Sequence, residues 1–313
     1  MKPMIILTGP TAAGKTNLSI SLAKAVNGAV ISADSMQVYK KMDIGTAKIM
    51  PEEMNGVDHY LIDILDPKEE FNVARFKQMA EEALKQIYAK GQIPIIVGGT
   101  GFYIQALLYD IQFTDTQKDE TYRKKLEAFA AEYGNQALHE KLKEVDPQSA
   151  RTIHQNNVKR VIRALEYYKE TGEPISAHNE RERQRTSPYQ FAYFVLTQKR
   201  DILYERINKR VDLMVAQGLV EEVTHLKEEG YDRSLVSMQG LGYKEILSYL
   251  DGEISLEEAI YLLKRDTRHF AKRQLTWFGR ERDVIMIEKQ AYKDEDEILN
   301  DMLVIMKKRG ILC

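Results

Sequence analysis

Apolar positions in the first hundred residues fall into two kinds of pattern. The short runs Met4–Thr8, Ala29–Ala33 and Ile93–Val97 are apolar and rich in branched residues, which indicates buried strands. Between them, Asn17–Val26 and Val73–Lys90 carry apolar residues every three or four positions, which indicates amphipathic helices. Strands that alternate with helices predict βαβ units and a parallel sheet, with ligands at the carboxyl ends of the strands.

The pattern changes after residue 113. Residues 118–185 are highly charged, offer no strand candidate and look almost wholly helical. Tyr189–Leu196 is strand-like again, helices resume from Ile202, and residues 290–309 predict a closing amphipathic helix. We therefore expect an α/β fold whose core is formed by residues 1–113 and 199–313, with a mainly helical insertion at 114–198 whose last strand returns to the core.

Composition narrows the class of protein. Of 313 residues, 43% are hydrophobic and 29% charged, which provides a core and disfavours a disordered chain or a coiled coil. No apolar run approaches the roughly 18 residues of a membrane span, and Met1–Leu7 lacks the cleavage site of a signal peptide. The single cysteine, Cys313, excludes a disulfide framework and any cysteine-ligated metal. We expect a reduced, cytoplasmic protein with no membrane partner.

Charge is distributed unevenly. The net charge of −2 argues mildly against a nucleic-acid partner. However, Lys264–Arg282 contains seven basic and two acidic residues, and Arg151–Arg185 contains eight basic and five acidic ones. A phosphate backbone responds to the local potential, so an RNA partner for the later half of the chain remains open.

A glycine-rich loop follows the first strand. It fits the pattern G-x-x-x-x-G-K-[ST] and consists of Gly9, Pro10, Thr11, Ala12, Ala13, Gly14, Lys15 and Thr16. Such a loop directs its backbone N–H groups and the start of the next helix at a phosphate. Lys15 adds a full charge, and the Thr16 hydroxyl can ligate Mg²⁺. The loop therefore predicts binding of a di- or triphosphate, as in ATP-binding proteins, but does not say which.

The chemistry that this loop serves is less clear from the motif alone. A kinase usually holds Mg²⁺ with a second carboxylate at the end of a buried strand. The third strand ends in Gly98-Gly99-Thr100, so only Asp34, after the second strand, is available. This mildly disfavours an ATP-using small-molecule kinase, which we keep as the alternative. It leaves room for an enzyme in which a diphosphate is the leaving group.

Several further motifs carry a resemblance to a known family. In chain order they are Asp34–Tyr39, Asp43–Lys48, Val97–Thr100 with Tyr103, Gly242–Glu245 and Thr267–Phe278. Together with the phosphate loop, this set closely resembles the bacterial tRNA dimethylallyltransferases (tRNA isopentenyltransferases) over nearly the whole chain. Ala13 departs from the serine often found in that family, which removes a hydroxyl but no backbone donor.

The resemblance implies a P-loop NTPase-like core and a specific reaction. It implies transfer of a dimethylallyl group from dimethylallyl diphosphate to N6 of the adenosine just 3′ of the anticodon, in tRNAs that read codons beginning with U. The glycine-rich loop would then hold the leaving diphosphate, with Mg²⁺ as cofactor. The implied partners are a tRNA anticodon stem-loop, gripped by the helical insertion, and dimethylallyl diphosphate. We expect a monomer without an obligate protein partner.

The resemblance also assigns catalytic roles. Asp34 matches the family's general base, and a carboxylate at a strand end suits that role; a turn or helix-capping aspartate is the alternative. Lys15 and Thr16 would stabilise the departing diphosphate. Arg210 matches a family arginine that would add a further cation, with a solvated helix charge as the alternative.

Further residues match tRNA-contacting positions of the family. These are Asp34, Ser35, Met36, Gln37, Thr100, Arg123, Lys159, Arg160, Val161, Ile162, Arg163, Gly242, Tyr243 and Lys244. Gln37 can read an adenine edge in a bidentate way. Thr100 is also a candidate helix N-cap, and Arg123 on sequence alone reads as a surface charge. On a helix, Arg160 and Arg163 share an outer face.

Phe270, Trp277 and Phe278 are expected to be core residues. A non-catalytic RNA-binding protein is a further alternative, against which the intact Lys15-Thr16 pair weighs.

Overall fold

The computed structural model describes residues 1–113 and 119–312. They form two compact units: a core unit, Met1–Leu108 with Pro188–Cys313, and a helical unit, Tyr109–Ser187. The helical unit begins at Tyr109, before the predicted start of the insertion at residue 114. It also ends before the predicted boundary at residue 198, because the strand after Pro188 belongs to the core unit. Residues 114–118, where the predicted insertion begins, and Cys313 lie outside the described residues.

The core unit contains a six-stranded parallel sheet in the order β3-β2-β4-β1-β5-β6. The strands are β1 (Lys2–Thr8), β2 (Gly28–Ala33), β3 (His59–Tyr60), β4 (Ile93–Gly98), β5 (Tyr189–Thr197) and β6 (Val284–Glu288). The prediction of a parallel sheet is confirmed, and the four predicted strands lie at its centre. The two edge strands were not predicted. β3 has only two residues, which is too short for a pattern. β6 does carry an apolar run, Val284–Ile287, which the sequence analysis did not single out; Met286 at its centre is 47% exposed.

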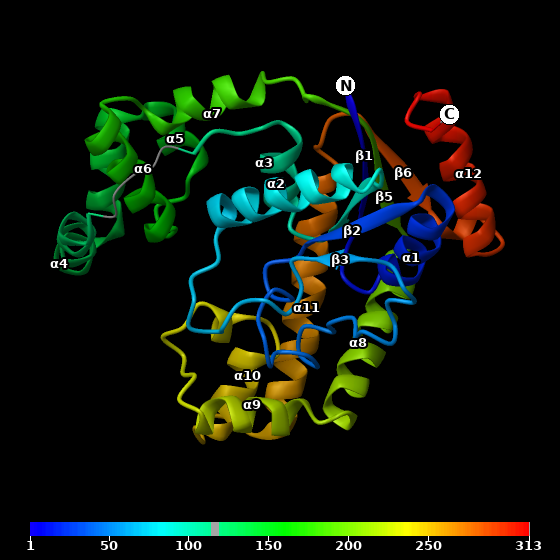
Figure 1. Cartoon of the computed structure of the whole chain (residues 1–313). Helices are drawn as coiled ribbons and strands as arrows, with labels where there is room; N and C mark the ends of the chain where they lie inside the picture. Colours follow the sequence, from blue (N-terminus) through cyan, green and yellow to red (C-terminus); the bar gives the residue numbers. More distant parts are fainter. Residues whose placement is uncertain (114–118, 313) are drawn as a thin grey trace. The chain divides into compact units, whose positions relative to one another are not determined.

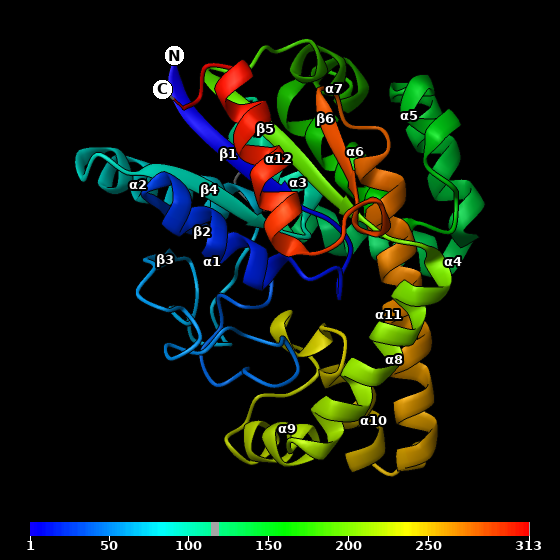
Figure 2. The same cartoon turned by 90° about the vertical axis from the view of Figure 1, so that its right-hand side faces the viewer.

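Helices cover both faces of this sheet. Those of the core unit are α1 (Lys15–Val26), α2 (Val73–Ala89), α3 (Gly101–Leu108), α8 (Arg200–Ala216), α9 (Leu219–Glu228), α10 (Tyr243–Leu250), α11 (Leu256–Phe278) and α12 (Glu295–Lys308), with short 3-10 helices at Ser237–Gln239 and Lys289–Ala291. Ile5 and Leu7 of β1 share one apolar cluster with Leu18 of α1 and Met302 of α12. Neighbouring strand residues point to opposite faces, so the buried Met4 and Ile6 point away from that cluster. Figure 2 shows α1 and α12 on the near side of the strands and α3 on the far side.

The helices α8 and α11 run side by side (Figures 1 and 2). Leu203 and Ile207 of α8 pack with Ala271 of α11 in a small apolar cluster. The Ser255 side chain caps α11 by accepting a hydrogen bond from the Glu258 N–H. This packing fixes the inward faces of both helices, which carry side chains of the site described below. Among the described residues, no helix combines the length and apolar character that a membrane crossing requires.

The helical unit consists of α4 (Glu120–Val145), α5 (Pro147–Thr152), α6 (Val158–Thr171) and α7 (Ile175–Arg183). Gly134 interrupts α4 with φ 85°, a conformation that glycine adopts at low cost. The buried Asp146 accepts hydrogen bonds from the N–H of Ser149 and from both the N–H and the hydroxyl of Ser176. The Asp146 carboxylate thus joins the start of α5 to the start of α7. The described residues of this unit contain helices and no strand, which confirms the prediction of a helical segment.

The carboxyl ends of three central strands meet at one edge of the sheet. Thr8 of β1 and Ala33 of β2 both lie in register with Gly98 of β4. The Thr8 hydroxyl donates to the Gly98 carbonyl over 2.7 Å. The loops that leave these strands, which begin at Gly9, Asp34 and Gly99, therefore start next to one another, where a parallel sheet places its ligands.

Candidate functional site

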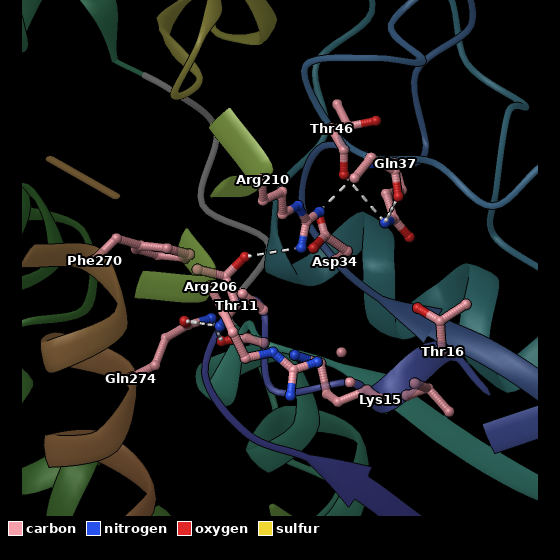
Figure 3. Close-up of a pocket in the computed structure, with 16 residues that line it drawn as sticks. Thr11, Lys15, Thr16, Asp34, Gln37, Thr46, Arg206, Arg210, Phe270 and Gln274 are labelled. Carbon is pink, nitrogen blue, oxygen red and sulfur yellow. Dashed lines mark hydrogen bonds between the residues drawn. The ribbon is translucent and has the colours of Figure 1, made fainter. Parts of the chain in front are cut away.

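A cavity of about 320 Å³ lies at this edge of the core unit (Figure 3). It is lined by residues from the phosphate loop, the β2 and β4 ends, the Thr46–Ala47 turn, α8 and α11: Thr11, Ala12, Gly14, Lys15, Thr16, Asp34, Gln37, Thr46, Ala47, Val97, Gly98, Gly99, Arg206, Arg210, Phe270 and Gln274. The structure therefore brings all four predicted catalytic residues, Lys15, Thr16, Asp34 and Arg210, into one cavity.

Backbone conformation shapes the phosphate loop. Gly9 has φ 147°, and a side chain there would meet the Leu196 carbonyl oxygen of β5 at 2.5 Å. Gly14, which begins α1, has φ 87°, and Ala12 also has a positive φ of 62°. The glycines thus allow a close approach to β5 and a turn that most residues adopt only with strain.

Lys15 lies across its own loop. Its ammonium donates to the carbonyl oxygens of Gly9 (3.0 Å) and Pro10 (2.8 Å). Burial, together with the nearby Arg210 guanidinium, lowers the pKa of Lys15 from 10.5 to about 8, and Asp34 opposes this shift. The lysine is therefore a desolvated cation whose charged form an incoming phosphate would favour.

Arg210 approaches the loop from α8. Its Nη1 donates to the Thr11 hydroxyl over 3.4 Å. Burial lowers the pKa of Arg210, while the Asp34 carboxylate acts in the opposite direction. Figure 3 shows its guanidinium beside Asp34. Within residues 1–113 and 119–312 neither group forms an ion pair, so the positive charge of Arg210 is available to an anion in the cavity.

Asp34 is held by a turn at the end of β2. Its Oδ1 accepts hydrogen bonds from the N–H groups of Met36 (2.8 Å) and Gln37 (3.3 Å). Among the described residues, no group donates to Oδ2. The turn role that the sequence left as an alternative is thus real, but it uses one oxygen. The other oxygen is free to take part in proton transfer.

Gln274 of α11 joins two loops beneath the cavity. Its Oε1 accepts from the Thr11 N–H over 2.8 Å, and its Nε2 donates to the Gly99 carbonyl over 3.0 Å. The side chain is 5% exposed, so both bonds are shielded from water. Gln274 therefore fixes the phosphate loop against the β4 end, a role that the sequence analysis did not identify.

Gln37 organises the opposite wall. Its Nε2 donates to the carbonyl oxygens of Thr46 (3.3 Å) and Ala47 (3.1 Å), two residues that line the cavity. In this structure the amide nitrogen thus supports the wall, and it could read an adenine edge only after giving up these bonds. The prediction that Gln37 contacts tRNA stays a prediction.

The residues at the loop suit a Mg²⁺ ion bound together with phosphate oxygens. Thr16 lines the cavity, and in the described chain its hydroxyl has no hydrogen-bond partner. No cluster of three or more histidine, cysteine or acidic side chains offers an alternative metal site in the described residues. A hydroxyl plus ligand phosphates and water is a donor set typical of Mg²⁺, so Thr16 would hold the ion.

The predicted tRNA-contacting residues of the core unit lie on three segments. Asp34, Ser35, Met36 and Gln37 form the turn after β2, and Thr100 precedes α3, where its carbonyl accepts the first helical hydrogen bonds. Gly242, Tyr243 and Lys244 begin α10. Tyr243 is fully buried and Lys244 is partly exposed, so of these two side chains only that of Lys244 is accessible to an RNA phosphate.

The remaining predicted tRNA contacts lie in the helical unit. Lys159, Arg160 and Arg163 are exposed on α6, whereas Val161 and Ile162 are buried in the core of the unit. The predicted separation of a basic outer face from an apolar inner face is thus confirmed, and the side chains of Val161 and Ile162 do not reach the surface. Arg123 forms a bidentate pair with Glu166, at 2.8 Å for each bond.

The aromatic prediction was right for one of three residues. Phe278 is fully buried. Trp277 is 38% exposed and packs edge-on against Phe102, and Phe270 lines the cavity. Arg206, also in the cavity, was missed, although its spacing of four residues from Arg210 puts both on one helix face.

Comparison with known proteins identifies the family. A profile of the IPP transferase family matches residues 37–281. A tRNA dimethylallyltransferase of Lachnoclostridium phytofermentans is 64% identical over 312 residues, covering 100% of both chains.

Solved structures agree in fold. The full-length tRNA isopentenylpyrophosphate transferase of Bacillus halodurans has a TM-score of 0.74 and 47% identity, covering 99% of this chain and 98% of that one. A eukaryotic dimethylallyltransferase acting on tRNA has a TM-score of 0.81 and 29% identity, covering 97% of this chain and 80% of that one. The six-stranded parallel core is thus the P-loop NTPase-like fold of the tRNA prenyltransferases, as predicted.

These likenesses give no support to the small-molecule kinase that the loop motif alone left open. The relative and the solved structure each cover nearly the whole chain, and both are named as tRNA prenyltransferases. The chain therefore belongs to the IPP transferase family, alongside the bacterial tRNA dimethylallyltransferases.

Proposed function

We propose that this chain transfers a dimethylallyl group from dimethylallyl diphosphate to N6 of an adenosine in tRNA and releases diphosphate. The adenosine is the one just 3′ of the anticodon in tRNAs that read codons beginning with U. The observation that carries the proposal is the shared cavity: a phosphate-binding loop and the free Oδ2 of Asp34 face the same space. The full-length identity to tRNA dimethylallyltransferases supports the choice of substrates.

The proposed reaction breaks one bond of the prenyl donor and forms one bond to the adenine, and different groups in the cavity assist each change. The C1–O bond of dimethylallyl diphosphate breaks, and its electron pair leaves with the diphosphate. The adenine N6 forms a bond to C1 and gives up one proton, which the carboxylate of Asp34 accepts. An exocyclic adenine amine is a weak nucleophile because its lone pair is delocalised, so removal of the proton as the bond forms assists attack.

The leaving diphosphate gathers negative charge as the C1–O bond breaks. Backbone N–H groups of the loop, Lys15 and Arg210 are fixed donors around the place where this charge develops. Donors that are already in position stabilise the transition state without reorganising. A Mg²⁺ ion bound at Thr16 would supply further charge neutralisation. The cations near the loop and the single carboxylate of Asp34 thus have separate roles.

The tRNA has to present its adenosine outside the base stack. An enzyme that reacts with a base extrudes it and pays the unstacking energy from contacts elsewhere. Lysine and arginine side chains suit phosphates of an anticodon stem-loop at two places. Lys244 at the start of α10 is partly exposed and pairs with Glu245 over 3.4 Å, and Lys159 and Arg160 are exposed on α6. They support an RNA substrate rather than a free nucleotide.

Labelled dimethylallyl diphosphate and an unmodified anticodon stem-loop test the proposal directly. We expect label in the RNA, one diphosphate released per group transferred, and no transfer when the target adenosine is replaced by guanosine, whose ring lacks the N6 amine. A parallel reaction with ATP and no prenyl donor serves as a control. ATP hydrolysis in this control, together with no label in the RNA of the main reaction, would contradict the proposal.

We further propose that the protein acts as a monomer in the cytoplasm. One cavity in the core unit contains every catalytic residue that the mechanism uses, and the only cysteine suits a reducing compartment. Light scattering during size-exclusion chromatography should give a mass near 36.1 kDa for the protein alone, and that mass plus one stem-loop when the RNA is bound. A stable dimer would contradict the monomer.

A further inference from the structure

Two arginines of α8 line the cavity, and the proposed mechanism assigns a role to only one of them, Arg210. Arg206 and Arg210 are four residues apart, so they lie one above the other on the same helix face. Both line the cavity. In Figure 3, Arg210 points to the side of Asp34, whereas Arg206 extends towards Lys15.

The two guanidinium groups serve different parts of the phosphate loop. Arg210 reaches Thr11, near the start of the loop. Arg206 Nη2 lies 3.5 Å from the point where a side chain on Gly14 would begin. Gly14 precedes α1, whose first N–H groups and partial positive charge favour an anion. Arg206 therefore stands where the loop and the helix start would meet a phosphate.

The charge of Arg206 is not neutralised within the protein. Its Nη1 makes one long hydrogen bond, 3.4 Å, to the side-chain oxygen of Gln198, and it forms no ion pair within the described residues. Lys289 provides the contrast. Its ammonium lies closer still, 2.9 Å from the same point at Gly14, but Glu295 pairs with it over 2.8 Å.

The balance of charge in the cavity lining favours an anion that carries several charges. Lys15, Arg206 and Arg210 contribute three cations, and Asp34 is the one carboxylate among the lining residues. A single phosphate monoanion would leave this lining positive. A diphosphate carries more negative charge than a single phosphate and therefore neutralises this excess of positive charge better.

We propose that Arg206 is a further catalytic residue, which binds the phosphate held at the Gly14 end of the loop while Arg210 binds at the Thr11 end. This inference rests on the proposed function. During transfer, the electron pair of the broken C1–O bond stays on the diphosphate, and Arg206 remains protonated throughout and donates hydrogen bonds to it. Guanidinium groups suit this role because their planar donors can contact two phosphate oxygens at once.

The test compares Arg206→Gln and Arg206→Lys with a control on the same helix, Lys209→Gln. Lys209 is exposed and pairs with Glu205 over 2.8 Å, and it does not line the cavity. Three quantities are measured: the affinity for inorganic diphosphate with Mg²⁺ by calorimetry, kcat/KM for dimethylallyl diphosphate, and the affinity for the stem-loop. We expect Arg206→Gln to lower the first two by about 10- to 100-fold, Arg206→Lys to recover part of the loss, and Lys209→Gln to leave both unchanged.

Three results would overturn the assignment: diphosphate affinity of Arg206→Gln within twofold of the parent protein, an equal loss in Lys209→Gln, or a loss confined to stem-loop affinity, which would make Arg206 an RNA contact. Melting temperatures check that every variant is folded. If the parent protein transfers no prenyl group, the proposed function fails, and the calorimetric comparison still decides the role of Arg206.

Discussion

The hydroxyl of Tyr243 donates a hydrogen bond of 2.7 Å to Oε1 of Glu222. The same carboxylate accepts from three successive backbone N–H groups, those of Asp43, Ile44 and Gly45, at 2.7 to 3.1 Å. One side chain of α9 therefore holds the loop that ends in the cavity wall and the buried tyrosine that begins α10. Through Gln37, which binds the Thr46 and Ala47 carbonyls, this arrangement continues to the turn that holds Asp34.

Replacing Glu222 with alanine should destabilise the fold and disturb the cavity wall. It leaves three N–H groups and a buried hydroxyl without their acceptor, and a buried donor without a partner costs about 1–3 kcal/mol. We expect a fall of roughly 2–3 kcal/mol in the free energy of unfolding, measured in urea. Tyr243→Phe, which removes one donor and keeps the ring, should cost about 1 kcal/mol. Glu221→Ala, at the neighbouring position of α9, is the control, and an equal effect there would contradict the role of Glu222.

Asp34→Asn separates proton transfer from structure. Asparagine keeps an oxygen that can accept from the Met36 and Gln37 N–H groups, but its amide cannot take the proton of the adenine amine. We expect kcat to fall by about 10²–10⁴-fold and the dissociation constant of the stem-loop to change by less than about twofold, because a general base acts in the transition state. Single-turnover kinetics and filter binding measure these values. A weakened RNA affinity with unchanged kcat would exclude the base role.

Gln274 should control the shape of the phosphate loop rather than its charge. In Gln274→Glu, one oxygen can still accept from the Thr11 N–H, but the other faces the Gly99 carbonyl, which loses its donor. It also adds a buried negative charge beside a diphosphate site. We expect diphosphate affinity to fall by at least about tenfold, as measured by calorimetry. Thr276→Ala should have no effect, because among the described residues the Thr276 hydroxyl bonds to the Lys272 carbonyl of the same helix. A similar loss in both variants would point to a general defect of the helix.

The sequence predicted the parts of this site that are local in the chain. The phosphate loop and Asp34 each follow a strand whose apolar run is continuous, so their position at the sheet edge could be inferred from strand–helix alternation. The same reasoning placed Arg160 and Arg163 on the outer face of α6, since helical periodicity separates them from Val161.

The remaining parts depend on contacts between distant segments. Gln274 is 263 residues from Thr11, and Glu222 is 177 residues from Gly45. No pattern within a short stretch of sequence predicts either of these contacts. The prediction that Gln37 reads adenine considered what the amide can bind, not the Thr46 and Ala47 carbonyls that the fold places next to it. Trp277 follows helical spacing but lies where α11 is only partly covered.

Activity should decline as the pH rises above about 8. Burial and Arg210 lower the pKa of Lys15 to about 8 in the unliganded site, so the ammonium is present below that pH and is lost above it. Since kcat/KM reports the free protein, we expect kcat/KM for dimethylallyl diphosphate to fall on the alkaline side with a midpoint near pH 8. Lys15→Arg remains charged at every accessible pH and should lack this inflection. An inflection near 10.5 in the parent protein would show that the lysine is not desolvated.

Two arginines of the helical unit should differ in their contribution to RNA binding. Arg160 is exposed on α6 and forms no ion pair within the described residues, whereas the pair between Arg123 and Glu166 is bidentate, and this pairing raises the pKa of Arg123 further. An unpaired arginine can bind a phosphate directly, whereas a paired arginine first has to break its ion pair with the carboxylate.

We therefore expect Arg160→Ala to weaken stem-loop binding and to reduce the slope of log Kd against log salt concentration by about one unit, as the loss of one phosphate contact requires. Arg123→Ala should change this slope less and destabilise the fold more, because it leaves the partly buried Glu166 without its partner. Lys143→Ala, an exposed lysine paired with Glu140 on α4, controls for the loss of net charge. Equal slopes for Arg160→Ala and Lys143→Ala would show that the stem-loop responds to overall charge and that Arg160 does not contact a phosphate.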